Sequence, residues 1–159
     1  MKVLVIDNEP NLRTAIKALL QAFCPEIKTI EEADGVKSGL QKIKAFQPDI
    51  VLLDVEMDDG SGFDLMKQVV NPGFQLIFVT AHNKYAIEAF QFSAIDYLLK
   101  PVDPDALQIS IQKAAVNMRN SNLQQQVQIL LQQLAGIQNH ERKIVLKDIE
   151  NTYFIKVSD

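Results

Sequence analysis

Five short apolar runs, separated by segments with the character of helices, constrain the fold more than any other feature of the sequence. The runs cover residues 3–6, 27–30, 50–53, 76–79 and 95–99. Helices are expected near residues 10–23, 35–46, 63–70, 84–92 and 103–118. Strict alternation of strand and helix predicts an α/β fold with a doubly wound, five-stranded parallel sheet.

The last predicted helix has two apolar stripes. Asp103 and Pro104 form a suitable N-cap and first turn. The first stripe consists of Leu107, Ile111, Ala114 and Met118. The second has the spacing of a heptad seam and consists of Leu123, Val127, Leu130, Leu134 and Ile137. The five-residue step from Met118 to Leu123 places the stripes on different sides of a straight helix, so we expect the first to pack on the sheet and the second on a partner.

These patterns predict three regions. Residues 1–118 are expected to form a compact domain, and residues 119–141 a helical linker with coiled-coil character. Because the last helix of the domain continues into the linker, the sheet domain should carry an extended C-terminal helix. No charged residue lies between Arg119 and His140. Residues 142–159 return to a strand-like pattern and are expected to begin a second domain that the sequence does not complete.

Charge and cysteine content exclude several classes of function. The net charge of −4 gives no global basic field, so DNA is expected to be bound only through another part of the protein. Cys24 is the single cysteine, which excludes an internal disulfide. The sequence shows neither a leader peptide nor an apolar stretch long enough to span a bilayer, which predicts a cytoplasmic protein without a membrane partner.

The predicted strands end on residues that carry chemistry. Asp7, Asp54, Thr80 and Lys100 each follow an apolar run. Each one alone is better explained as a turn former or helix cap. In the strand order 2-1-3-4-5, however, Asp7 and Asp54 lie side by side at the edge where open α/β sheets bind ligands. Two adjacent carboxylates favour a hard cation such as Mg²⁺, and Lys100 suits a phosphate.

Four stretches, in this order, resemble the receiver domain of two-component response regulators. They are VLVIDNEP, DIVLLDVEM followed by Gly62, FVTA, and DYLLKP, within residues 1–118. Residues 79–107 are similar to receivers that precede a LytTR-type (LytR/AlgR-like) DNA-binding domain, and KIVLKDIENTYFIKVSD is similar to the first strands of that domain. The resemblance implies a flavodoxin-like receiver in a transcription regulator, which is a phosphoacceptor and not an enzyme.

The resemblance also implies a role for individual residues. Asp54 would accept a phosphoryl group from a sensor histidine kinase. Mg²⁺ would be held by Asp7, Asn8, Asp54 and the backbone carbonyl of Glu56. Lys100 would pair with a phosphoryl oxygen.

Two further residues would form a switch. Thr80 would donate its hydroxyl to the phosphoryl group, and Tyr97 would change rotamer in response. The output surface would comprise the helix near residues 84–92, the strand at 95–99 and the following helix, and a homodimer would form there, through the linker helix, or through both. DNA would be contacted only by the domain that begins near residue 142.

The sequence departs from the receiver pattern at two positions. Asn8 stands where receivers usually have a second acid that contacts the metal, so the metal site loses one negative charge. Glu9 could compensate through a water molecule if its side chain turns inward. Met57-Asp58 stands where Met-Pro is usual.

Two alternative functions stay open. A receiver that has lost phosphorylation could act only as a dimerisation module, and Asn8 is the residue that favours this alternative. A phosphatase of the haloacid dehalogenase type also uses an aspartate after a strand together with Mg²⁺, but only part of its motif is present. Nucleotide-binding folds are disfavoured because neither GxGxxG nor GxxxxGK[ST] follows the first strand.

Overall fold

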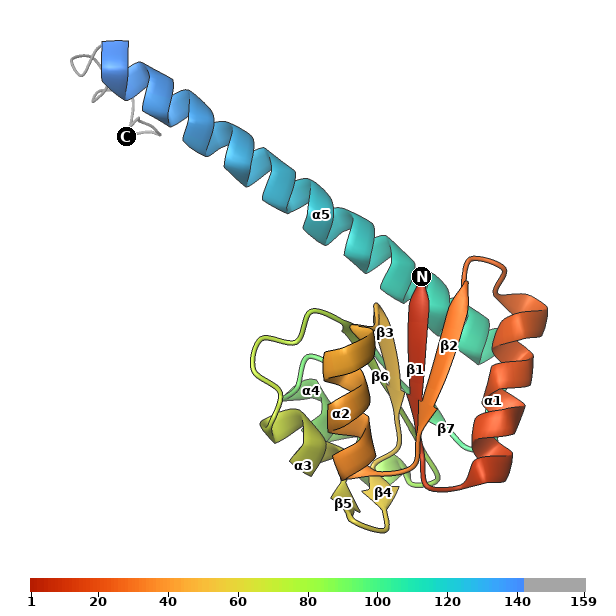
Figure 1. Ribbon diagram of the computed structural model, residues 1–159. Coiled ribbons are helices and arrows are strands. Elements are labelled where there is room, and N and C mark those ends of the chain that lie inside the picture. Colours follow the sequence, from red (N-terminus) through yellow and green to blue (C-terminus); the bar gives the residue numbers. More distant parts are fainter. Residues whose placement is uncertain (142–159) are drawn as a thin grey trace. The chain divides into compact units, whose positions relative to one another are not determined.

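The computed structural model describes residues 1–141 and contains a five-stranded parallel sheet (Figure 1). Its strands are β1 (Lys2–Ile6), β2 (Thr29–Ala33), β3 (Ile50–Leu53), β6 (Gln75–Thr80) and β7 (Asp96–Leu99). Their order in the sheet is β2-β1-β3-β6-β7, and every neighbouring pair is parallel. The predicted order is therefore confirmed, with β1 and β3 adjacent.

Helices cover both faces of the sheet, as the doubly wound fold requires. One face is covered by α1 (Pro10–Phe23) and the first part of α5 (Pro104–Glu141). The other is covered by α2 (Val36–Phe46), α3 (Gly62–Lys67) and α4 (Ala86–Phe90) (Figure 1). The side chains of β1 alternate between the two cores: Val3 and Val5 face α1 and α5, whereas Leu4 and Ile6 face α2 and α3.

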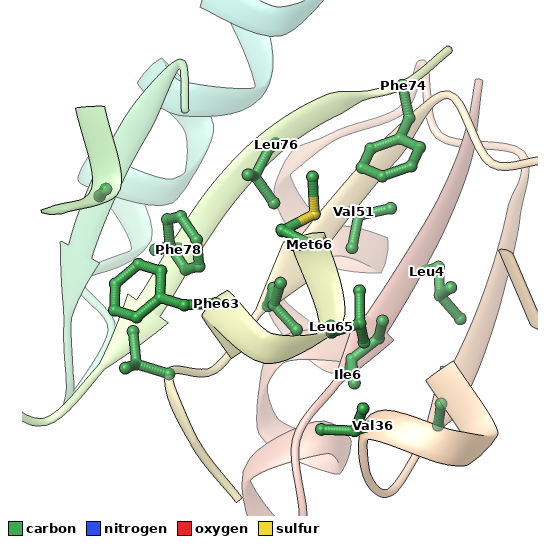
Figure 2. Close-up of a cluster of buried hydrophobic side chains, with 14 residues drawn as sticks. Leu4, Ile6, Val36, Val51, Phe63, Leu65, Met66, Phe74, Leu76 and Phe78 are labelled. Carbon is green, nitrogen blue, oxygen red and sulfur yellow. The ribbon is translucent and has the colours of Figure 1, made fainter. Parts of the chain in front are cut away.

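The core beneath α2 and α3 is built around aromatic and branched side chains (Figure 2). Phe63 of α3 packs against Phe78 of β6, with ring centroids 5.0 Å apart. Leu65 and Phe78 are fully buried, and each such side chain contributes roughly 1.5–3 kcal/mol through removal of apolar surface from water. This core fixes the positions of β3 and β6, whose ends carry candidate site residues.

The position of β2 corrects the sequence prediction. The strand was expected at residues 27–30 because they include two isoleucines, but it spans Thr29–Ala33. Its Glu31 and Glu32 are tolerated at the sheet edge because cations pair with them: Lys42 lies 2.5 Å from Glu31, and Lys17 lies 2.7 Å from Glu32. A search for apolar runs does not detect a strand whose carboxylates are neutralised by lysines of the two flanking helices.

The loops and short helices after β3 and β6 also differ from the expectation. A two-stranded antiparallel ribbon forms between β4 (Glu56–Met57) and β5 (Gly60–Ser61). The helix expected at residues 63–70 is shorter, because α3 ends at Lys67. The helix expected at residues 84–92 begins as the 3₁₀ turn η1 (Asn83–Tyr85) and continues as α4.

The predicted extended C-terminal helix is confirmed, because α5 is helical over 38 residues. Leu107, Ile111 and Ala114 are buried in the core beside α1, as predicted for the first stripe. The contacts of the chain define two units, Met1–Met118 and the residues from Arg119 onward. Pairing of the second stripe with a partner stays a prediction, and the expected second domain at 142–159 lies outside the described residues.

None of the helices that the structure describes is long and apolar enough to cross a membrane.

Gly62, at the start of α3, lies against the backbone of Asp54 and Val55, directly after β3. Its N–H donates a hydrogen bond to the carbonyl of Val55 (2.8 Å). A Cβ atom at residue 62 would lie only 2.4 Å from the backbone carbonyl oxygen of Asp54. Only glycine therefore allows this close approach of the two backbone segments.

We expect Gly62→Ala to destabilise the fold by about 2 kcal/mol, because the added methyl group forces the Asp54 backbone to move. Gly73→Ala is the matched control, since no atom lies within 4 Å of a Cβ built there. It should stay within about 0.5 kcal/mol of the wild type. Urea denaturation measures both, and equal stability of the two variants would contradict the close contact.

Candidate functional site

Backbone hydrogen bonds extend the sheet beyond its strands and position the predicted site residues. The N–H of Asp7 donates to the carbonyl of Ala33 (3.0 Å), and the N–H of Asp54 donates to the carbonyl of Ile6 (3.0 Å). The N–H of Lys100 donates to the carbonyl of Thr80 (2.8 Å). These bonds bring Asp7, Asp54, Thr80 and Lys100 to one edge of the sheet.

The Lys100 ammonium lies between the two aspartates. Its Nζ is 2.9 Å from Asp7 Oδ2 and 3.0 Å from Asp54 Oδ2. Both carboxylates are almost completely buried. Burial alone would lower the pKa of Lys100, but the contacts with Asp7 and Asp54 outweigh it and raise the pKa. Lys100 is therefore a cation that makes two adjacent buried carboxylates tolerable.

The two aspartates are not equivalent. Burial raises the pKa of Asp54, the hydrogen bond from Lys100 opposes this effect, and the nearby charge of Asp7 adds to it. Asp54 Oδ1 accepts a long hydrogen bond from the N–H of Glu56 (3.3 Å). Asp7 Oδ1 accepts one from the N–H of Glu9 (2.8 Å), whereas Asp7 Oδ2 is in ion contact with Lys100 without an aligned hydrogen bond.

The two residues after Asp7 make different contacts. Asn8 Nδ2 donates a hydrogen bond to Asp58 Oδ1 (3.2 Å), which joins the two positions that depart from the receiver pattern. Glu9 is largely exposed, but its Oε1 reaches to 3.5 Å from Lys100 Nζ. The inward turn considered for Glu9 thus brings it to the lysine.

The two predicted switch residues lie on adjacent strands. Thr80 is buried, and its Oγ1 has no hydrogen-bond partner among the described residues. A buried hydroxyl without a partner is costly, so this atom is suited to a ligand. The hydroxyl of Tyr97 donates to the backbone carbonyl of His82, in the loop that follows Thr80. Burial raises the pKa of the Tyr97 hydroxyl, which is therefore neutral at physiological pH.

Glu56 makes contacts that the sequence did not indicate. Its carboxylate accepts a hydrogen bond from the hydroxyl of Tyr85, and its Oε1 lies 3.2 Å from His82 Nε2. The hydrogen bond from Tyr85 lowers the pKa of Glu56. Sequence reasoning does not find these contacts, because nothing in the segment around Tyr85 indicates a carboxylate 29 residues away.

The site opens into a cavity of about 450 Å³. It is lined by Asn8, Glu9, Asp54, Glu56, Met57, Asp58, Thr80, Ala81, His82 and Lys100. A larger and more apolar cavity of about 650 Å³ lies between the ends of α2 and α3, around Pro48 and Phe74. The smaller cavity is the better candidate because the buried ionisable groups converge on it.

A chain with this sheet order and this set of strand-end residues has the features of a receiver. The model of the response regulator receiver domain matches residues 3–112. The chain therefore belongs to the response regulator receiver domain family, which functions in two-component signalling.

Curated relatives place it more narrowly. The chain is 32% identical to the sensory transduction protein LytT of Bacillus anthracis, in an alignment that covers all of this chain and 67% of that protein. It is 38% identical to LytT of Bacillus cereus over 71% of this chain and 46% of that protein. LytR of Staphylococcus haemolyticus is 35% identical over 77% of this chain and 48% of its own length. The resemblance to LytTR-type regulators is confirmed, and the chain spans about half to two thirds of these relatives.

Solved structures agree on the fold. A CheY-like response regulator receiver domain protein from Methanospirillum hungatei matches 76% of this chain and 97% of its own, with a TM-score of 0.68 and 23% identity. The response regulatory domain of mrkE from Klebsiella pneumoniae matches 76% of this chain and 99% of its own, with a TM-score of 0.67 and 23% identity.

The raised pKa of Asp54 has a consequence for stability. Ionisation of this buried carboxyl costs free energy in the folded state, so we expect Asp54→Asn to raise the free energy of unfolding at pH 7, by an amount on the order of 1 kcal/mol. The gain should shrink as the pH falls through the raised pKa toward the ordinary pKa of an aspartate, because Asp54 is then neutral in both the folded and unfolded states. Thermal unfolding at several pH values measures it, and a pH-independent difference would contradict the assignment.

Proposed function

We propose that this chain is a phosphorylation-controlled switch of a transcription regulator, and that Asp54 accepts the phosphoryl group from a sensor histidine kinase. The observation that carries the proposal is the placement of two buried carboxylates around the Lys100 ammonium at the edge of a receiver sheet. The whole regulator would act in the cytoplasm and bind DNA through the domain that begins near residue 142.

The transfer would use Asp54 as a nucleophile. A carboxylate oxygen of Asp54 would form a bond to phosphorus while the bond from phosphorus to the kinase histidine breaks, which leaves an acyl phosphate and a free imidazole. Lys100, already 3.0 Å from Asp54 Oδ2, would move its contact to a phosphoryl oxygen. Thr80 Oγ1 would donate a hydrogen bond to another phosphoryl oxygen and so satisfy its buried hydroxyl.

The residues at the site fit a magnesium ion. Within residues 1–141, no three side chains of His, Cys, Asp and Glu form a ready metal cluster. The oxygen donors are the carboxylates of Asp7 and Asp54, the carbonyl of Glu56 and the side-chain oxygen of Asn8, and such donors with added water suit Mg²⁺. When bound, Mg²⁺ would neutralise charge on the transferred phosphoryl group.

The response to phosphorylation would pass through the loop that follows β6. The hydroxyl of Tyr97 donates a hydrogen bond to the carbonyl of His82 in this loop. The carboxylate of Glu56 contacts the same segment through Tyr85 and the His82 ring. A move of Thr80 toward the phosphoryl group would displace the loop and change these contacts. Next to it, Ile87 and Phe90 of α4 and Leu99 of β7 are exposed apolar residues. They favour a homodimer surface on α4, β7 and α5, with the linker helix as a second dimer contact.

Phosphorylation is tested by mass measurement. With Mg²⁺ and acetyl phosphate, the wild type should gain one phosphoryl group, whereas Asp54→Asn should gain none. Glu88→Gln on α4 removes a carboxylate outside the cavity and should be labelled like the wild type. An unlabelled wild type would instead support the phosphorylation-deficient dimerisation module, and turnover of small phosphate esters would support the phosphatase.

Metal affinity depends on residue 8. We expect Asn8→Asp to raise Mg²⁺ affinity about tenfold, because it adds a carboxylate at a ligand position. The same substitution also ends the donation of a hydrogen bond from Asn8 to Asp58. Asn11→Asp adds the same charge on an exposed residue of α1 and is the control. Titration by tyrosine fluorescence measures both affinities, and equal affinities would show that residue 8 is not a metal ligand.

A further inference from the structure

The second part of α5 exposes an apolar stripe on its own. Every side chain from Arg119 to Gly136 is exposed. Leu123, Val127, Leu130 and Leu134 retain 48–59% of their accessible surface. A helix with such a stripe is typical of a surface that is covered in an assembly.

The spacing of the stripe defines a heptad register. In a heptad, a d position is followed four residues later by an a position, and an a position is followed three residues later by a d position. Leu123 and Leu130 therefore occupy d positions, and Val127 and Leu134 occupy a positions. Counted forward, the next d position in the sequence is Ile137. Counted backward, the register reaches Asn120 at a and Val116 at d.

An ion pair indicates where the seam begins. The a position before Asn120 is Lys113, whose Nζ lies 3.2 Å from Asp96 Oδ2 of β7. Lys113 is therefore engaged with its own domain. Val116, which is 47% exposed, is the next residue of the register. From residue 116 to residue 137 the register covers three heptads, about the minimum for a stable coiled coil.

We propose that α5 pairs with α5 of a second copy of this chain, as a parallel two-stranded coiled coil over residues 116–137 in which Asn120 faces Asn120. A β-branched residue at a with leucine at d, as in Val127 and Leu130, favours two parallel strands. A parallel, in-register pair lets the two Asn120 amides bond to each other. An antiparallel pair would place each amide against an apolar residue and leave it unsatisfied.

The flanking positions favour an identical partner. Over residues 116–137 the e and g positions, which choose between partners in other coiled coils, are Asn117, Arg119, Gln124, Gln126, Leu131 and Gln133. Arg119 is the single charged residue among them. In a parallel pair it faces Gln124 of the partner helix, so two identical helices meet no like-charge repulsion. This inference rests on the homodimer of the proposed function and specifies its linker contact, but it does not depend on phosphorylation.

The first test measures the oligomeric state of the full chain without phosphate donor, by sedimentation at tens of micromolar protein. The wild type should be a dimer, and Leu130→Glu should dissociate at least tenfold more readily. Gln132→Glu introduces the same charge at the outward f position and should stay dimeric. A monomeric wild type, or a dimer unaffected by Leu130→Glu, would overturn the proposal. Neither result depends on phosphorylation of Asp54. The mass measurement tests that phosphorylation independently, so the two proposals can fail separately.

The second test addresses orientation and the role of Asn120. Oxidation should link two copies of Leu123→Cys, because d positions face each other in a parallel pair, whereas Gln125→Cys at f should not be linked. The native Cys24 is buried and can stay. Asn120→Val should raise the melting temperature and allow assemblies larger than a dimer. Absence of the residue-123 crosslink, or an unchanged melting temperature and assembly in Asn120→Val, would refute the parallel Asn120 pair.

Discussion

The contact of one ammonium group with two buried carboxylates is the interaction on which the rest of the site depends. Adjacent parallel strands place Asp7 and Asp54 side by side, and burial without a cation would make both charges costly. Lys100 supplies that cation, and it directly follows β7, the strand at one margin of the sheet. The strand order thus decides the electrostatics: β1 and β3 bring the two acids together, and β7 brings their partner.

The same edge of the sheet is connected to the protein surface by two tyrosines. The hydroxyl of Tyr85 donates to the side chain of Glu56, whose backbone carbonyl is a proposed metal ligand, and the hydroxyl of Tyr97 donates to the backbone of the loop after Thr80. Both contacts join the site to the segment that leads into α4. A change in the position of that loop would therefore alter the hydrogen bonds of Tyr85 and Tyr97, which is the route of transmission that we propose.

The sequence predicted the elements that are buried on both faces and missed features that depend on side chains outside their own segment. Uniformly apolar residues 50–53 identified β3, and the polar residues after the strands predicted which side chains the fold brings together at one edge of the sheet. The strand β2 was misplaced because Glu31 and Glu32 are paired by cations from helices. The bond from Asn8 to Asp58 and the contacts of Glu56 join loops whose distance is set only by the fold. The heptad stripe was visible in the sequence, but one chain cannot show what covers it.

The neutral side chain of Asn8 has a consequence for the total charge of the site. Asp7 and Asp54 together with Lys100 carry one net negative charge, and Glu9, 3.5 Å from Lys100 Nζ, adds another. In the proposed phosphorylated state, Mg²⁺ and a phosphoryl group of about two negative charges in place of the Asp54 charge would leave these groups with about one net negative charge. A second acid at residue 8 would add one more. The amide would therefore limit the negative charge beside the phosphoryl group, at the expense of attraction for the metal before transfer.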